Sequence, residues 1–307
     1  MNRRHAIMPG MSRWVMTCVL AALACAEAPT STRTWSSQAA AGPESWRRAA
    51  PADWRVLFNG RDLSGWVVKL AHHDLGDNYA NTFRVVDGAI AVRYDGYGDD
   101  FGARFGHLFY EEPFTHYVLA LEYRIQGPQQ RGGPDYARLN SGVMVHSQAP
   151  RTILKDQDWP ISVEAQFLAG NQTTMNVCTP GTDIFMHGAI VKAHCTNSSS
   201  RRYVEDGAWV SVQVEVLGGE RVRHYVDQQL VLEYESPTIG GGVANGYDPA
   251  IKVDGRRLAA GYIGLQAESQ PVEFRNIRLL DLTGCMDPGA PGYRPYVVNR
   301  DDARCRR

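Results

Sequence analysis

The sequence predicts an all-β fold, a sandwich or barrel of short antiparallel strands. The first observation is an alternation of apolar and polar residues with period two, seen clearly at 119–126 and 210–216. The second is that Gly and Pro punctuate these segments throughout the chain. The third is that no convincing amphipathic helix is longer than two turns. Many short strands separated by turn signals are typical of sandwiches and barrels.

The strands follow one another along most of the chain. The segments 221–226 and 230–234 are separated by Asp227, Gln228 and Gln229, which predicts a hairpin. Long loops over a sheet are often functional, and 71–79 and 173–200 are the two long segments that do not have strand character. The expected strands are 119–126, 140–146, 161–169, 210–216, 221–226, 230–234, 261–267 and 272–280.

The N-terminal region predicts export. Residues 1–26 combine a positive start, an apolar stretch and the small-x-small sequence Ala24-Cys25-Ala26, which together form a cleavable signal. Two alternatives stay open, a lipid anchor at Cys25 and a retained membrane anchor, although the apolar run is short for a membrane span. Residues 27–50 are expected to be a disordered spacer, 51–283 the folded domain, and 284–307 a C-terminal tail. The protein is therefore expected in the periplasm or secreted, with a membrane contact only through a lipid anchor at Cys25.

Four cysteines remain after the signal: Cys178, Cys195, Cys285 and Cys305. They allow three pairings, of which the local one, Cys178–Cys195 and Cys285–Cys305, closes two short loops. An exported protein meets an oxidising environment, which favours disulfides. Zinc binding is the weaker alternative because no Cys-x-x-Cys spacing occurs.

The charge balance gives no sign of a nucleic-acid partner. The formal net charge is −1, and no cluster of Lys and Arg is interleaved with aromatic residues. Removing residues 1–26 removes three Arg and no acidic residue, which leaves 29 basic and 33 acidic residues, a balance of −4. A small carbohydrate is the partner that the following pattern favours.

Polar side chains recur on one face of several expected strands. In the strand 161–169, Glu164 and Gln166 share a face, about 7 Å apart along the strand. One interpretation is a solvated outer face, which antiparallel sheets commonly have. The alternative is a sugar-binding face, because acids, amides, Arg and His match the donors and acceptors of sugar hydroxyls. The candidates on neighbouring strands are Arg124, Asn140, His146, Gln266 and Glu268, and His107 is a further candidate ligand.

One resemblance extends over residues 54–282. The segment Leu57-Phe58-Asn59-Gly60-Arg61-Asp62-Leu63-Ser64-Gly65-Trp66 resembles the opening signature of the 3-keto-disaccharide hydrolase family, also described as 3-keto-glucoside 1,2-lyase and 3-keto-2-hydroxy-glucal hydratase. Further motifs resemble the family in order: 83–88, 122–124, 140–143, Glu164-Ala165-Gln166, 264–266 and 274–277. The resemblance implies a concanavalin A-like jelly roll of two antiparallel sheets. One departure is the hairpin turn, where Asp227-Gln228 replaces the usual Asn-Gly.

The resemblance implies chemistry on glycosides oxidised at C3. The ketone makes the C2 proton acidic, so a base can remove it and the C1 substituent can leave by elimination, with later hydration giving net hydrolysis. We expect Glu164 and His146 to be catalytic, as base, acid or ligands of a divalent cation such as Ca, Mn or Zn. We expect Arg124, Asn140, Gln166, Gln266, Glu268 and His107 to bind substrate. The competing hypothesis is a non-catalytic carbohydrate-binding module or lectin on the same fold.

Overall fold

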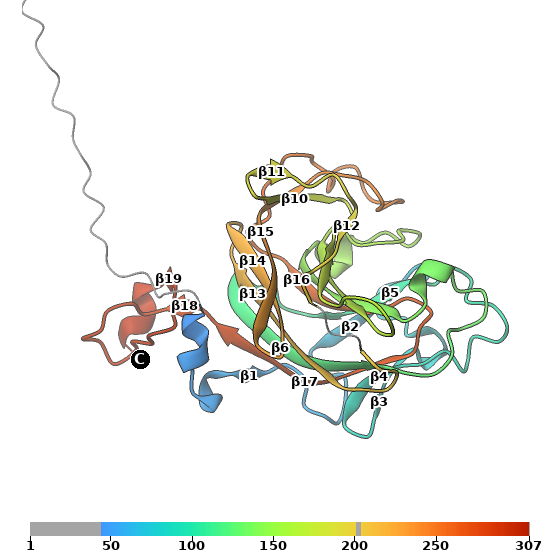
Figure 1. Ribbon diagram of the computed structural model, residues 1–307, viewed down its shortest axis with the longest axis horizontal. Coiled ribbons are helices and arrows are strands. Elements are labelled where there is room, and N and C mark those ends of the chain that lie inside the picture. The colour runs from blue at the N-terminus through green and yellow to red at the C-terminus, as the bar shows by residue number, and fades with distance from the viewer. Residues whose placement is uncertain (1–43, 201–203, 307) are drawn as a thin grey trace, which may run out of the picture. The chain divides into compact units, whose positions relative to one another are not determined.

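The computed structural model describes residues 44–200 and 204–306. It confirms the predicted fold class, a jelly-roll sandwich of the concanavalin A-like kind whose two large sheets are antiparallel (Figure 1). The described part contains short 3-10 helices and no α-helix. The predicted signal at 1–26 and most of the predicted spacer lie outside the described residues.

We call the larger sheet sheet A and the smaller sheet B. In spatial order sheet A contains β11 (Ala189–Ile190), β10 (Thr182–Met186), β15 (Gln229–Ile239), β14 (Arg221–Val226), β13 (Val210–Leu217), β6 (His116–Ile125), β17 (Val272–Asp281), β4 (Ala89–Val92) and β3 (Phe83–Val86), with β1 (Arg55–Val56) also paired to β17. Sheet B contains β12 (Cys195–Thr196), β9 (Asn176–Cys178), β8 (Val163–Leu168), β7 (Asn140–Ser147), β16 (Tyr262–Ala267), β5 (Gly106–Tyr110) and β2 (Trp66–Leu70). A small parallel pair joins β18 (Thr283–Gly284) and β19 (Asn299–Arg300). The 3-10 helices are η1 (Ser45–Arg48), η2 (Pro51–Asp53), η3 (Tyr79–Asn81), η4 (Asp135–Ala137), η5 (Pro150–Thr152) and η6 (Asp302–Arg306).

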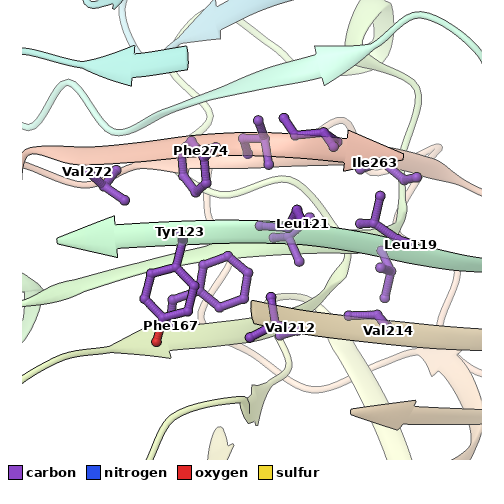
Figure 2. Packing of buried hydrophobic residues seen from close by; sticks show 14 of the residues in the cluster. Leu119, Leu121, Tyr123, Phe167, Val212, Val214, Ile263, Val272 and Phe274 are labelled. Atoms are coloured by element: carbon purple, nitrogen blue, oxygen red, sulfur yellow. The ribbon is translucent and has the colours of Figure 1, made fainter. Parts of the chain in front are cut away.

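The main core lies between the two sheets and consists of the apolar halves of the alternating strands. Figure 2 shows Leu119, Leu121 and Tyr123 of β6 packed beside side chains of β13 and β17. The Tyr123 ring stacks on Phe167 of β8, with ring centroids 4.4 Å apart and planes 5° from parallel. The Tyr123 hydroxyl donates to the carbonyl of Leu168 at 3.1 Å, so this buried polar atom is satisfied. These contacts join sheet A to sheet B and fix which face of each strand points outward.

The β14–β15 hairpin turns at Asp227 and Gln228, as predicted. Both residues have positive φ, 47° and 67°, as a two-residue turn of type I′ requires. Neither residue is glycine, so the departure from Asn-Gly leaves the turn in place at a conformational cost.

A second apolar cluster covers the outer face of sheet A. Trp46 of η1 is only 5% exposed and packs edge-on against Tyr225 of β14. The expected boundary of the spacer at residue 50 is therefore wrong, because the chain is packed from Ser45 onward. The cluster consists of Trp46, Val118, Tyr225, Leu280, Leu282, Tyr296 and Val297.

Both disulfides have the local pairing. Cys178 and Cys195 lie opposite each other on β9 and β12, and Cys285 bonds Cys305 within the tail. Two disulfides are typical of proteins that are exported from the reducing cytoplasm. None of the described helices is both long and apolar enough to span a bilayer.

Candidate active site

The outer face of sheet B carries the polar halves of its strands. Across β8, β7 and β16 the residues Ala165, Val143 and Leu265 point into the core. Their neighbours therefore point outward, and the pairing aligns Glu164 with Met144 and Gly142 with Gln166. The result is a row of acids and amides on one surface, as the alternation in the sequence predicted.

A pocket of about 450 Å³ opens on this face. Residues of the strands, with Glu268 directly after β16, form its floor, and residues from the connecting loops form its mouth. The floor residues are Asn140, Glu164, Gln166, Cys178, Cys195 and Glu268. The mouth residues are Tyr136, Asp158, Trp159, Pro180, His194, Val243 and Asn245.

Glu164 reaches the centre of the floor because Gly142 has no side chain. A Cβ at Gly142 would lie 2.4 Å from Glu164 Oε1 and 2.8 Å from its Cγ, so the Glu164 side chain occupies the space above this glycine. Glycine in a strand interior commonly marks such a close approach. Gln266, on the far side of β7, hydrogen-bonds the Glu164 carboxyl. The side chain therefore crosses β7 toward β16.

The floor combines two carboxyls that burial makes costly to ionise. Glu164 is 6% exposed, and Glu268, directly after β16, is 3% exposed. Burial raises the pKa of Glu164, and the hydrogen bond from Gln266 opposes this only in part. Burial, and then the charge of Glu164, raises the pKa of Glu268 well above its usual range. Both carboxyls therefore resist ionisation, and a charge on one opposes a charge on the other.

Several buried polar atoms of this region have no hydrogen-bond partner within the described part of the chain. They are Asn140 Oδ1, Glu164 Oε1, Gln266 Oε1, Glu268 Oε2 and His107 Nε2. Buried polar atoms are nearly always paired in folded proteins, and an unpaired group costs about 1–3 kcal/mol. Their concentration on one face indicates a surface built to receive the hydroxyls or carbonyl of a ligand.

His107 and Gln266 lie beside the pocket and do not line it. They face each other across β5 and β16. The His107 ring lies 5.9 Å from the ring of Trp159, which does line the mouth. Burial, with a smaller contribution from the Lys69 ammonium, lowers the pKa of His107 to about 3, so the imidazole is neutral. Their predicted role in substrate binding stays a prediction.

His146 does not lie beside Glu164, so its expected position is wrong. The pairing of β16 with β7 contains a register shift between Tyr262 and Gly264, and His146 has a positive φ of 51°. A bulge of this kind reverses the alternation of side chains. His146 consequently points to the other sheet, where its Nε2 donates to the carbonyl of Gly218 at 2.8 Å.

Arg124 is also placed away from the pocket. It belongs to β6 of sheet A, whereas Glu164 belongs to sheet B. Its Nε donates to Glu273 at 2.6 Å, and its guanidinium lies 4.7 Å from the ring of Trp209. The sequence pattern put both polar faces on one surface because alternation alone does not tell which strands share a sheet.

A hydrogen-bonded pair holds two mouth loops together. The Asp158 carboxylate accepts from the Asn245 backbone N–H at 2.7 Å and from its Nδ2 at 2.8 Å. It also accepts from the backbone N–H of Trp159. On the floor, the Cys178–Cys195 disulfide lies in the same row as Glu164, because Glu164 pairs with Cys178.

The donors of the floor suit a cation that prefers oxygen. Oxygens of Asn140, Glu164, Glu268 and Gln266 are buried and unpartnered among the described residues, which fits the carboxylate and amide ligands of Ca²⁺ or Mn²⁺. A zinc site containing His146 does not fit, since His146 points to Gly218. The group of His and Cys that does converge within the described residues, Cys178, His194 and Cys195, contains the two sulfurs of the disulfide.

Sequence reasoning missed Gly142 and the mouth residues Tyr136, Val243 and Asn245. A signal for Gly142 was present, since glycine within a predicted strand indicates that another group approaches closely. The mouth residues come from loops of irregular conformation, whose contacts follow no sequence period.

A β-sandwich with a polar pocket on one sheet and acids and amides in its floor belongs to the class of carbohydrate-associated domains. The chain belongs to the family of 3-keto-alpha-glucoside-1,2-lyase-like domains, whose family model matches residues 53–280. No curated protein matches the chain.

Solved structures that resemble the chain do so at low sequence identity. One from Parabacteroides distasonis, described as a "putative glycosyl hydrolase", is 17% identical, with a TM-score of 0.47, and the match covers 76% of this chain and 97% of the other. The carbohydrate-binding module CBM66 from Bacillus subtilis is 12% identical, with a TM-score of 0.42, and the match covers 71% of this chain and 96% of the other.

Proposed function

We propose that this protein cleaves 3-keto-glycosides by removing the C2 proton and expelling the C1 substituent, with hydration of the product completing a net hydrolysis. The observation that carries the proposal is the buried pair Glu164 and Glu268 in the pocket floor, where burial and mutual repulsion raise both pKa values and oppose the ionisation of both carboxyls at once. Once Glu164, whose pKa is raised to about 8, has lost its proton, the pair supplies a carboxylate and a carboxylic acid in one site.

Each carboxyl has a distinct role in this mechanism. The carboxylate of Glu164 takes the C2 proton, which the neighbouring ketone makes acidic. The carboxylic acid of Glu268 donates a hydrogen bond to the C3 oxygen, where negative charge develops. The electrons then return to form the C1–C2 double bond as the C1–O bond breaks. Glu164 delivers its new proton to the leaving oxygen, so the pair ends in its starting state.

The floor amides complete the binding of the sugar. Asn140 donates its Nδ2 to the carbonyl of Tyr136 at 3.3 Å, which leaves Oδ1 to accept from a sugar hydroxyl. Gln166 lines the floor beside them. A divalent cation held by the oxygens of Glu164, Glu268 and Asn140 would polarise the C3 carbonyl and compensate the negative charge of the two carboxylates.

The test measures turnover of methyl 3-keto-glucosides of both anomers, with EDTA and with added Ca²⁺ or Mn²⁺. We expect Glu164→Gln and Glu268→Gln each to lower kcat/KM by at least about a hundredfold, as loss of a general base or an oxyanion donor does. Arg124→Gln, on the other sheet, is the matched control and should keep full activity. Sugar binding without turnover by the unaltered protein would reject the proposal in favour of a non-catalytic binding module.

A further inference from the structure

The mouth of the pocket differs chemically from its floor. Tyr136 is 63% exposed and Val243 is 44% exposed, whereas the floor carboxyls are nearly inaccessible. Exposed large apolar side chains at a pocket entrance commonly mark a binding surface. A ligand that fills the floor with its sugar ring would therefore extend past Tyr136 and Val243.

In two mouth loops the Asp158 carboxylate and the Asn245 amide nitrogen are already hydrogen-bonded within the protein. Both oxygens of Asp158 accept hydrogen bonds from Asn245, and Asn245 Nδ2 also donates to the carbonyl of Val243 at 2.8 Å. In the floor the opposite holds, since Glu164 and Glu268 each have an oxygen without a partner among the described residues. A second sugar ring at the mouth would find the Asp158 carboxylate already occupied, which is unfavourable for its hydroxyls.

We infer that the mouth is a subsite for an apolar leaving group, formed by Tyr136, Val243 and the ring of Trp159. The substrate class is then a 3-keto-glycoside of an alkyl or aryl alcohol in preference to a disaccharide. This inference rests on the proposed function, because it assigns the floor to the oxidised sugar. Asn140 links the two regions, since it lines the floor and holds the Tyr136 carbonyl.

The test compares methyl, butyl and hexyl 3-keto-glucosides, whose leaving alcohols have similar acidity. We expect kcat/KM to rise at least about tenfold from methyl to hexyl, because each buried methylene favours binding. The double variant Tyr136→Ser/Val243→Ser should lose most of this rise. Val56→Ser, an exposed valine of β1 in sheet A, is the matched control.

A kcat/KM independent of chain length, or a rise that persists in the double variant, would overturn the inference. Calorimetric binding of the unoxidised hexyl and methyl glucosides separates this outcome from failure of the proposed function. Chain-length-dependent affinity that needs Tyr136 and Val243, without turnover of any 3-keto-glucoside, would reject the proposed reaction and support the subsite. Turnover of all three substrates at one rate would support the proposed reaction and reject the subsite.

Discussion

Replacing Gly142 by alanine tests whether the position of the Glu164 carboxyl controls activity. The new methyl carbon would lie 2.4 Å from Glu164 Oε1. Ordinary contacts are about 3.5 Å or longer, so the carboxyl must move by about 1 Å. A displacement of that size costs about a hundredfold in rate, which corresponds to about 2.7 kcal/mol in the activation free energy.

The assay is kcat/KM on a methyl 3-keto-glucoside, together with a thermal melt. Gly142 does not need a positive φ, so alanine fits its backbone and the fold should persist. Gly289→Ala is the control, because its Cβ would meet only Asp287 Oδ1 at an ordinary 3.4 Å. In the background of Glu164→Gln, Gly142→Ala should have little further effect, since both changes act on one side chain. Full activity of a folded Gly142→Ala protein would refute the reasoning.

Three further predictions concern stability. Glu164→Gln and Glu268→Gln should each raise the unfolding free energy at pH 8 by about 1–2 kcal/mol, because the folded protein resists an ionisation that the unfolded chain undergoes above pH 4.5. Denaturant melts at pH 8 and pH 4 should show this gain in stability only at pH 8. A gain at both pH values would count against the prediction. Burial lowers the pKa of His146 from 6.5 to about 4, so the folded protein resists protonation there and the unfolding free energy should fall as the pH drops from about 6.5 to 4. His146→Gln should reduce this fall by about 3 kcal/mol. An unchanged pH dependence of the variant's melts would contradict the assignment. Replacing Cys178 and Cys195 by serine opens a loop with a sequence separation of 17 and should lower the unfolding free energy by about 3 kcal/mol. Calorimetry should also show weaker binding of hexyl glucoside. Melts equal to those of the parent protein would disprove the stability prediction.

The fold class could be predicted because its cause is local. Alternation with period two specifies strands whose one face is buried, and positions such as Leu121 and Val212 lie in the core as the pattern requires. The hairpin at Asp227 was predictable for the same reason, since turn residues separate two alternating segments. Family motifs supplied the sandwich topology, which alternation alone leaves open.

The candidate site could be predicted only in part. Glu164 and Asn140 share a face and a sheet, so their common placement followed from the strand pattern. Arg124 was misplaced because sheet membership depends on long-range pairing. His146 was misplaced because a single bulge inverts the side-chain direction. The mouth depends on loop contacts such as Asp158 with Asn245, which join residues 87 positions apart.

The packing of η1 against the C-terminal tail has a consequence for engineering. The Ser45 hydroxyl donates to the carbonyl of Tyr296 at 3.3 Å, and Trp46 shares a cluster with Val297. The first and last segments of the described chain are therefore neighbours, as circular permutation requires. Both lie over sheet A, while the pocket opens on sheet B. A short peptide joining them would leave the pocket unaltered, and new ends could be cut into an exposed loop.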